Sequence, residues 1–108
     1  MIRYIHEHFG EPLKVKELAA QAGLSEYQFE QRIKRVLQIT PGQLIQKVRM
    51  EAATRRLRES RDGIAAVALD CGYSDQSAFT RQFRQTTGLS PTEYRRAVQS
   101  EIARAQGV

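Results

Sequence analysis

Residues 64–84, with the sequence IAAVALDCGYSDQSAFTRQFR, carry the pattern that decides the fold. The small side chain of Ala68 allows a second helix to pack closely against the first. Four residues later, Gly72 supplies the positive φ that a tight turn between two helices requires. Phe79 then provides an apolar anchor between the two helices. This order of residues predicts a helix-turn-helix unit.

The same unit occurs twice in the chain. Residues 18–44 match residues 67–94, at an offset of 49 up to the serine that follows the turn and of 50 after it. The first copy has Ala19, Gly23 and Phe29 at the three positions that define the turn. Because a fixed offset between similar segments indicates a duplicated structural unit, we expect two helix-turn-helix subdomains joined by a helix.

Apolar residues recur at helical spacing along the whole chain, and no segment alternates apolar and polar residues as a strand does. The predicted fold class is therefore all-α, with about seven helices. The expected helices cover residues 2–9, 15–23, 25–37, 41–60, 64–72 and 75–86, and a last helix begins at Ser90-Pro91, runs through Val98 and frays near Gly107. The expected domains are a first subdomain over 1–40, a long linker helix over 41–60 and a second subdomain over 61–108.

The ends of these helices carry capping signals. Ser25 precedes the second helix of the first unit, and Gln28 stands where a capping box requires it. Ser74 or Asp75 is expected to cap the equivalent helix of the second unit. Apolar spacing predicts that the helix over 25–37 buries one face, formed by Phe29, Ile33, Val36 and Leu37.

Composition limits the classes of function. The 108 residues include 17 Lys and Arg against 12 Asp and Glu, for a net charge of +5, which favours a polyanionic partner. The longest apolar run, Ile64 to Leu69, is too short to span a membrane, and the charged N-terminus does not resemble a secretory signal. A single cysteine excludes a disulfide framework, and the chain lacks a catalytic triad, a glycine-rich phosphate loop and a metal cluster. We therefore expect no enzyme, no metal and no cofactor.

The chain resembles the DNA-binding domain of the AraC/XylS family of bacterial transcription regulators over about residues 3–98. The most specific match covers residues 64–84, followed by Gly88-Leu89-Ser90-Pro91 and Tyr94-Arg95. The first unit departs from the family pattern at Gln31, Ile33, Gln38 and Leu44, where the family usually has arginine, phenylalanine, glycine and an aromatic residue.

This resemblance implies a regulator that places each recognition helix in a major groove of double-stranded DNA. It further implies control of transcription in the bacterial cytoplasm, most often activation through contact with RNA polymerase. Family members usually carry a separate effector or dimerisation domain, to which nothing in this sequence corresponds. The alternatives are a stand-alone short regulator and an excised C-terminal domain, of which the second is favoured, and we expect the chain to bind DNA as a monomer.

The outer face of the first recognition helix holds the first set of candidate contacts. Gln31 suits an adenine edge, and Tyr27 suits either a thymine methyl group or a phosphate. Basic residues further along are expected to bind phosphates, which fix register without reading sequence. The base candidates are Tyr27, Gln28 and Gln31, and the phosphate candidates are Arg32, Lys34 and Arg35.

The second recognition helix supplies the other set. Arg81 corresponds to the arginine with which the family reads bases, and such a side chain favours the O6 and N7 atoms of guanine. The alternative for Arg81 is a surface ion pair with Asp75 or Asp70. The base candidates are Gln76, Ser77, Thr80 and Arg81, and Arg84 is the phosphate candidate.

Other polar and reactive residues are expected to have structural roles. Cys71 is interpreted as a small buried apolar residue, and His6 and His8 diverge on their helix and form no metal pair. Arg49 is expected to form an internal salt bridge. The sequence does not decide whether Arg55, Arg56, Arg58 and Arg61 form a solvated stripe, a phosphate contact or a partner surface. A helical protein-interaction module and a basic membrane-surface protein are the alternative functions.

Overall fold

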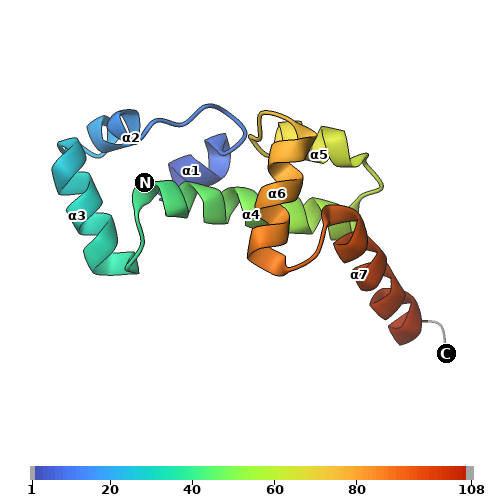
Figure 1. Ribbon diagram of the computed structural model, residues 1–108. Coiled ribbons are helices and arrows are strands. Elements are labelled where there is room, and N and C mark those ends of the chain that lie inside the picture. Colours follow the sequence, from blue (N-terminus) through green and yellow to red (C-terminus); the bar gives the residue numbers. More distant parts are fainter. Residues whose placement is uncertain (1, 107–108) are drawn as a thin grey trace. The chain divides into compact units, whose positions relative to one another are not determined.

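The computed structural model describes residues 2–106, with the side chain of residue 2 left aside. Within this part of the chain every regular element is an α-helix, as Figure 1 shows, and the predicted all-α fold with seven helices is confirmed. The helices are α1 (Ile2–His8), α2 (Val15–Gln21), α3 (Glu26–Leu37), α4 (Pro41–Glu59), α5 (Ile64–Asp70), α6 (Gln76–Thr87) and α7 (Pro91–Gln106).

The chain forms two compact units, Met1–Arg49 and Met50–Val108, and the division between them falls inside α4. The first unit holds α1, α2, α3 and the first half of α4. The second unit holds the remainder of α4 together with α5, α6 and α7. Each unit therefore contains one copy of the sequence repeat, with a helix before it and a helix after it.

The first unit is a helix-turn-helix built around one apolar cluster. Gly23 has a φ of +72° between α2 and α3, and the Leu24 amide donates to the Ala19 carbonyl over 2.9 Å. Ala19 is buried where α2 packs against α3, as its small side chain predicts. The cluster of buried residues comprises Ile5, Leu18, Ala19, Phe29, Ile33, Leu44, Ile45 and Val48.

The predicted core face of α3 is wrong at its C-terminal end. Val36 is 70% exposed and Leu37 is 37% exposed, whereas Phe29 and Ile33 are buried. The reason is that Gln38 adopts a left-handed conformation that ends the helix, and Ile39 then packs against the core. Ile39, which follows the turn, is thus half-buried against the cluster, and Val36 is not.

The second unit repeats the turn and replaces part of the aliphatic core by aromatic rings. Its turn glycine has a φ of +92°, and the Tyr73 amide donates to the Ala68 carbonyl over 3.0 Å. The rings of Tyr73, Phe79, Phe83 and Tyr94 form a chain with centroid separations of 5.0, 5.6 and 5.4 Å. These rings link the turn, α6 and α7 into one packed layer. Phe79 and Phe83 are completely buried.

The capping predictions are confirmed at both recognition helices. Ser25 and Gln28 form a reciprocal capping box at the start of α3. At the start of α6 the cap is Asp75 rather than the serine before it, because a carboxylate oxygen of Asp75 accepts from the Ala78 amide over 2.7 Å. The prolines that begin α4 and α7 follow a threonine and a serine that make the same kind of reciprocal contact.

A half-buried arginine ties distant segments together in each unit. Arg49 donates to the carbonyls of Phe9 and Glu11 at 2.8 and 3.0 Å in the first unit. Arg95 donates to the Leu57 carbonyl at 3.2 Å in the second. The predicted salt bridge of Arg49 is therefore wrong, because its partners are backbone oxygens left free where α1 ends.

Exchanging the residues that end the two recognition helices is expected to change stability in opposite directions. Gln38 has a φ of +61°, and its counterpart Gly88 has a φ of +81°, where an added Cβ would meet no atom within 4 Å. A left-handed conformation costs a residue with a Cβ about 1–2 kcal/mol. We expect Gln38→Gly to raise the free energy of unfolding by about 0.5–1 kcal/mol, and Gly88→Gln to lower it by about 1 kcal/mol.

Urea unfolding followed by circular dichroism measures both changes. Gln38→Ala is the control, because it shortens the side chain and keeps the Cβ that makes the backbone unfavourable. It should give no gain in stability. A loss of stability for Gln38→Gly would show that glycine's flexibility in the unfolded chain outweighs the relief of strain.

Candidate nucleic-acid interface

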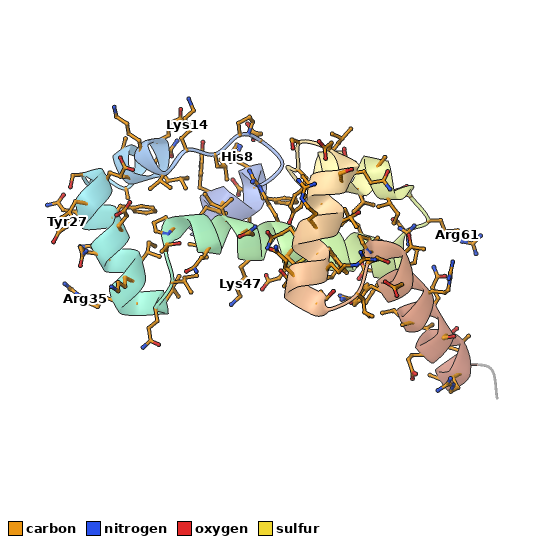
Figure 2. All side chains as sticks on the ribbon, viewed as in Figure 1. His8, Lys14, Tyr27, Arg35, Lys47 and Arg61 are labelled. Carbon is orange, nitrogen blue, oxygen red and sulfur yellow. The ribbon has the colours of Figure 1, made fainter. Side chains whose placement is uncertain are left out.

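The outer face of α3 presents a continuous polar surface. Tyr27, Gln31 and Arg35 follow one another at intervals of four residues and are all exposed, Tyr27 by 70%. Figure 2 shows the labelled side chains of Tyr27 and Arg35 extending away from the helix. A shallow pocket of about 360 Å³ runs along this face, lined by Leu24, Tyr27, Gln28, Gln31, Arg32 and Arg35. The structure thus brings together five of the six candidate contacts predicted for this helix.

The side chains of Gln28 and Gln31 differ in the hydrogen-bonding groups that remain available to a ligand. The Gln28 Oε1 accepts from the Ser25 amide over 3.0 Å as part of the capping box. Gln31 forms no side-chain hydrogen bond with any other described residue. A paired amide contact to adenine uses both the amide oxygen and the amide nitrogen. Gln31 can therefore make that contact while the capping box stays intact, whereas Gln28 cannot.

The outer face of α6 carries side chains of a different chemistry from those on the outer face of α3. Gln76, Ser77 and Arg81 are exposed, whereas Thr80 is half-buried. Arg84 is exposed and lies 3.8 Å from a carboxylate oxygen of Glu93. The pKa of Glu93 is lowered, chiefly because its carboxylate accepts from the Ser90 amide.

The alternative ion pair of Arg81 is absent from the described part of the chain. Asp75 uses its side chain as the cap of α6, and Asp70 pairs with Arg56. No ion pair among residues 2–106 includes Arg81. Its guanidinium group is thus available to an external ligand.

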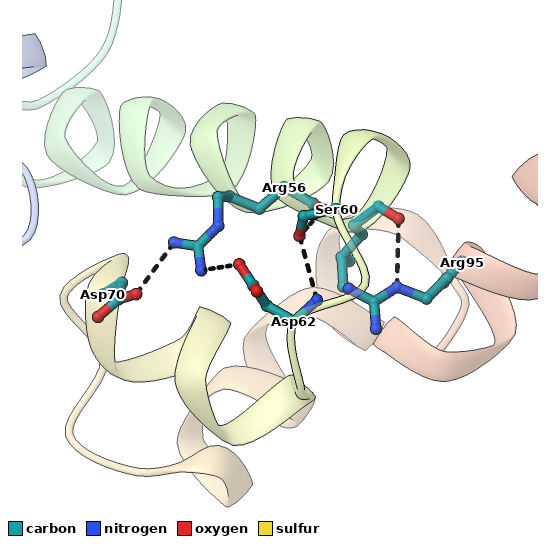
Figure 3. A network of polar contacts seen from close by, with 6 residues as sticks. Arg56, Ser60, Asp62, Asp70 and Arg95 are labelled. Atoms are coloured by element: carbon teal, nitrogen blue, oxygen red, sulfur yellow. Dashed lines mark hydrogen bonds and ion pairs between the residues drawn. The ribbon is translucent and has the colours of Figure 1, made fainter.

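Arg56, near the end of α4, contacts both the turn that precedes α5 and the last residue of α5. Its guanidinium group contacts Asp62 at 2.6 Å and Asp70 at 3.1 Å, as Figure 3 shows. The hydrogen bond from Arg56 lowers the pKa of Asp62, and the same contact raises that of the arginine. The Ser60 hydroxyl donates to the Arg56 carbonyl and accepts from the Asp62 amide, which fixes the intervening turn.

This network gives a structural role to one of the four arginines, at positions 55, 56, 58 and 61, whose roles the sequence did not decide. Arg56 is a structural contact inside the second unit, and Arg58 donates to the Tyr94 hydroxyl over 3.2 Å. Arg55 and Arg61 are exposed, and Figure 2 shows Arg61 extending from the turn after α4. Residue spacing carries no signal for the Arg56 network, because its two acids lie on separate segments that only the folded turn brings together.

The cysteine and one of the two histidines that the sequence analysis considered make contacts within the fold. Cys71 is buried, as predicted, and burial raises the pKa of its thiol. His8 contacts Glu11 and stacks on Tyr4 with a centroid separation of 4.3 Å. Among the described residues, no cluster of His, Cys, Asp or Glu side chains is suited to hold a metal ion. No described helix is long and apolar enough to cross a membrane.

Each unit has a first helix that packs through two buried residues and a second helix that exposes a polar face, and together the two units define a double helix-turn-helix protein. Residues 18–97 match the family described as "Helix-turn-helix domain". The chain belongs to the AraC/XylS-type family of helix-turn-helix, DNA-binding transcription regulators.

Individual relatives agree with this assignment. The chain is 32% identical over 95 residues to the regulatory protein SoxS of Salmonella typhimurium, in a match that covers 88% of this chain and 89% of SoxS. It is 36% identical over 91 residues to the probable transcriptional regulator LumQ of Photobacterium leiognathi, covering 84% of this chain and 37% of LumQ. The chain spans about a third of the length of LumQ and of two other relatives.

A solved structure extends the similarity to a complex with DNA. The DNA-binding domain of AdpA, described as a global transcriptional factor and solved with a target DNA, superposes with a TM-score of 0.88. The two chains are 31% identical, and the match covers 93% of this chain and 90% of the AdpA domain. The fold of the present chain is thus one that binds a target DNA in a relative.

Proposed function

We propose that this chain binds a specific double-stranded DNA site through α3 and α6 and thereby regulates transcription. The observation that carries the proposal is the repeated geometry. In both units the second helix of the turn buries its aromatic anchor and exposes a face of polar and basic side chains. A helix of this kind fits the major groove, where its first turns meet the base edges.

The exposed residues divide into two roles under this proposal. Those near the start of each recognition helix read bases, and those further along bind phosphates, since phosphate contacts fix register and orientation. The proposed base contacts are Tyr27, Gln31, Gln76, Ser77 and Arg81, with smaller roles for Gln28, which is engaged in its cap, and for Thr80, which is half-buried. The proposed phosphate contacts are Arg32, Lys34, Arg35 and Arg84.

We further propose that one molecule binds an asymmetric site of two parts. The two outer faces carry different side chains, with Tyr27 and Gln31 in one and Ser77 and Arg81 in the other. Different side chains prefer different bases, so the two halves of the site differ in sequence. The 19 residues of α4 correspond to about 28 Å of helix. That length approaches one turn of B-DNA, about 34 Å, and any shortfall is met by bending the duplex.

The broader biological role follows from the family. We propose that the chain activates transcription through contact with RNA polymerase, and that it acts in the bacterial cytoplasm, on the nucleoid, where its duplex partner is found. Support comes from the resemblance of residues 64–84 to regulators of this kind. Selection of sites from a randomised duplex library identifies the sequence that the chain prefers, and a reporter gene placed beside that sequence measures activation or repression.

A salt titration tests whether DNA is the partner. We expect the affinity for the selected duplex to fall steeply with salt, with a slope of about −0.9 in log K against log salt for each phosphate neutralised. Fluorescence anisotropy with a labelled duplex measures this slope. Arg35→Gln should reduce the magnitude of this slope by about 1 and weaken binding to all DNA sequences alike.

The controls separate DNA binding from the alternative functions. Glu30→Gln, on the same helix, removes no cation and should leave the slope unchanged. A helical protein-interaction module shows no affinity for duplex DNA at low salt, and that result would contradict the proposed function.

A further inference from the structure

The two copies of the repeat differ most where their recognition helices begin. The exposed aromatic Tyr27 corresponds to Ser77, and Gln31 corresponds to Arg81. The pocket on α3 also contains an aliphatic side chain from the turn, Leu24, which is only half-buried. The first unit thus combines exposed apolar surface with a free amide, and α6 has neither feature at the corresponding positions.

Two kinds of group border this pocket. Leu24 and the ring of Tyr27 offer apolar surface, and the amide of Gln31 offers a donor and an acceptor one helical turn beyond Tyr27. Residues four apart lie on the same face of a helix, one above the other. Arg32 and Arg35, which carry charge suited to phosphate, lie further along the helix. The apolar part is therefore at the end of the helix where base edges approach.

One base pair offers, in the major groove, both an apolar group and a donor–acceptor pair that match the groups bordering the pocket. An A·T pair presents the N7 acceptor and N6 donor of adenine, together with the C5-methyl group of thymine. Gln31 is the amide able to bind adenine in a paired manner, because the Oε1 of Gln28 is held by the Ser25 amide. A phosphate offers no apolar group to Leu24 and Tyr27.

We propose that the pocket on α3 recognises the 5-methyl group of a thymine, with Leu24 and Tyr27 around the methyl group and Gln31 on an adenine. This inference rests on the proposed function and specifies which feature of DNA the first unit reads. The second unit has Ser77 in place of the tyrosine and does not recognise a methyl group in this way. The first half of the site therefore carries an essential thymine whose methyl group contributes to affinity.

Replacing thymine by deoxyuridine tests the proposal directly, because deoxyuridine keeps the pairing and removes only the methyl group. Thymines of the selected site are replaced one at a time, and the dissociation constant is measured by anisotropy. The first half of the site is identified as the half in which the Arg81→Ala variant keeps the base preferences of the original chain. We expect one replacement there to weaken binding about fourfold, the effect of one buried methyl group, and replacements in the second half to have no such effect.

Two variants of Tyr27 link the effect to the pocket. Tyr27→Ser grafts the residue of the second copy and should make thymine and deoxyuridine bind alike. Tyr27→Phe keeps the ring and should preserve the fourfold difference. Because Tyr27 is exposed, both variants should fold, and circular dichroism melting checks this.

Several results would overturn the inference. It is wrong if no first-half replacement weakens binding in the original chain, or if the selected first half contains no thymine. It is also wrong if Tyr27→Phe and Tyr27→Ser weaken both duplexes equally, since the tyrosine hydroxyl would then bind a phosphate. In each case salt-dependent, sequence-specific binding would persist, so the proposed function would stand. Loss of all duplex affinity in the original chain would instead remove both.

Discussion

Inserting about 5 bp, half a helical turn, between the two halves of the selected site is expected to abolish the tight complex. The insertion rotates one half to the opposite face of the duplex. A molecule that reads both halves from one face of the duplex, as proposed, cannot follow this rotation. Binding by both units at once would then be lost, and the remaining affinity would be that of one unit.

The size of this effect follows from linkage. A second unit held on the same molecule binds at a high effective concentration, which raises the overall affinity by about 10² to 10⁴ over either unit alone. We therefore expect the insertion to weaken binding by a factor in this range, measured by gel shift or anisotropy. The control replaces the sequence between the two halves with a different one of unchanged length, and it should have little effect.

An unchanged affinity after insertion would contradict binding by both units. In that case a single unit would read the DNA, and we expect it to be the second. Its residues 64–84 carry the most specific part of the family pattern, and Arg81 stands at the family's base-reading position. The first unit has Gln31 there instead.

The repeat predicted most of the fold because its signals are local. A turn glycine, a capping serine and a proline at the first position of a helix each act within a few residues of where they stand. Two copies of the same signals reinforce one another. The positions of the seven helices accordingly agree with the sequence to within two residues at their ends.

The incorrect predictions concern contacts between segments. Periodicity placed Val36 in the core because it assumes that a neighbour exists along the whole helix. Val36 is exposed, and Ile39, after the left-handed Gln38, packs against the cluster. Arg49 was expected to meet an acid and meets carbonyls at the end of α1. Such partners are set by the path of the turns, which residue spacing does not encode.

The sequence predicted which helix faces form the candidate site better than it predicted the contacts of the individual side chains. Helical spacing identified exposed residues on α3 and α6 correctly, apart from the half-buried Thr80 and the exposed Val36 and Leu37. The capping-box spacing predicted that Gln28 is engaged in its cap. The sequence did not show that Leu24 lines the same pocket as Tyr27 or that Arg81 is free of Asp70. These distinctions depend on which hydrogen bonds form, and they narrow the set of base-reading residues.

Removing the guanidinium group of Arg81 is expected to cost about 1–3 kcal/mol of specific binding, a loss of roughly 5- to 150-fold in affinity. Arg81 is exposed and has no ion-pair partner among the described residues, so the variant Arg81→Ala should keep its fold. A bidentate contact to guanine is specific, and its loss should relax the preference at one base position in the second half of the site. Site selection repeated with the variant measures that preference.

Two further variants separate base reading from phosphate binding. Arg84→Ala should weaken all sequences to a similar degree and reduce the salt slope by about 1, since this side chain is the proposed phosphate contact. Arg81→Gln places the residue of the first copy in the second unit and should shift the preferred base from guanine towards adenine, because an amide pairs with adenine N6 and N7. If Arg81→Ala instead lowers the affinity equally for every sequence, Arg81 is a phosphate contact and α6 reads its half of the site through Gln76 and Ser77.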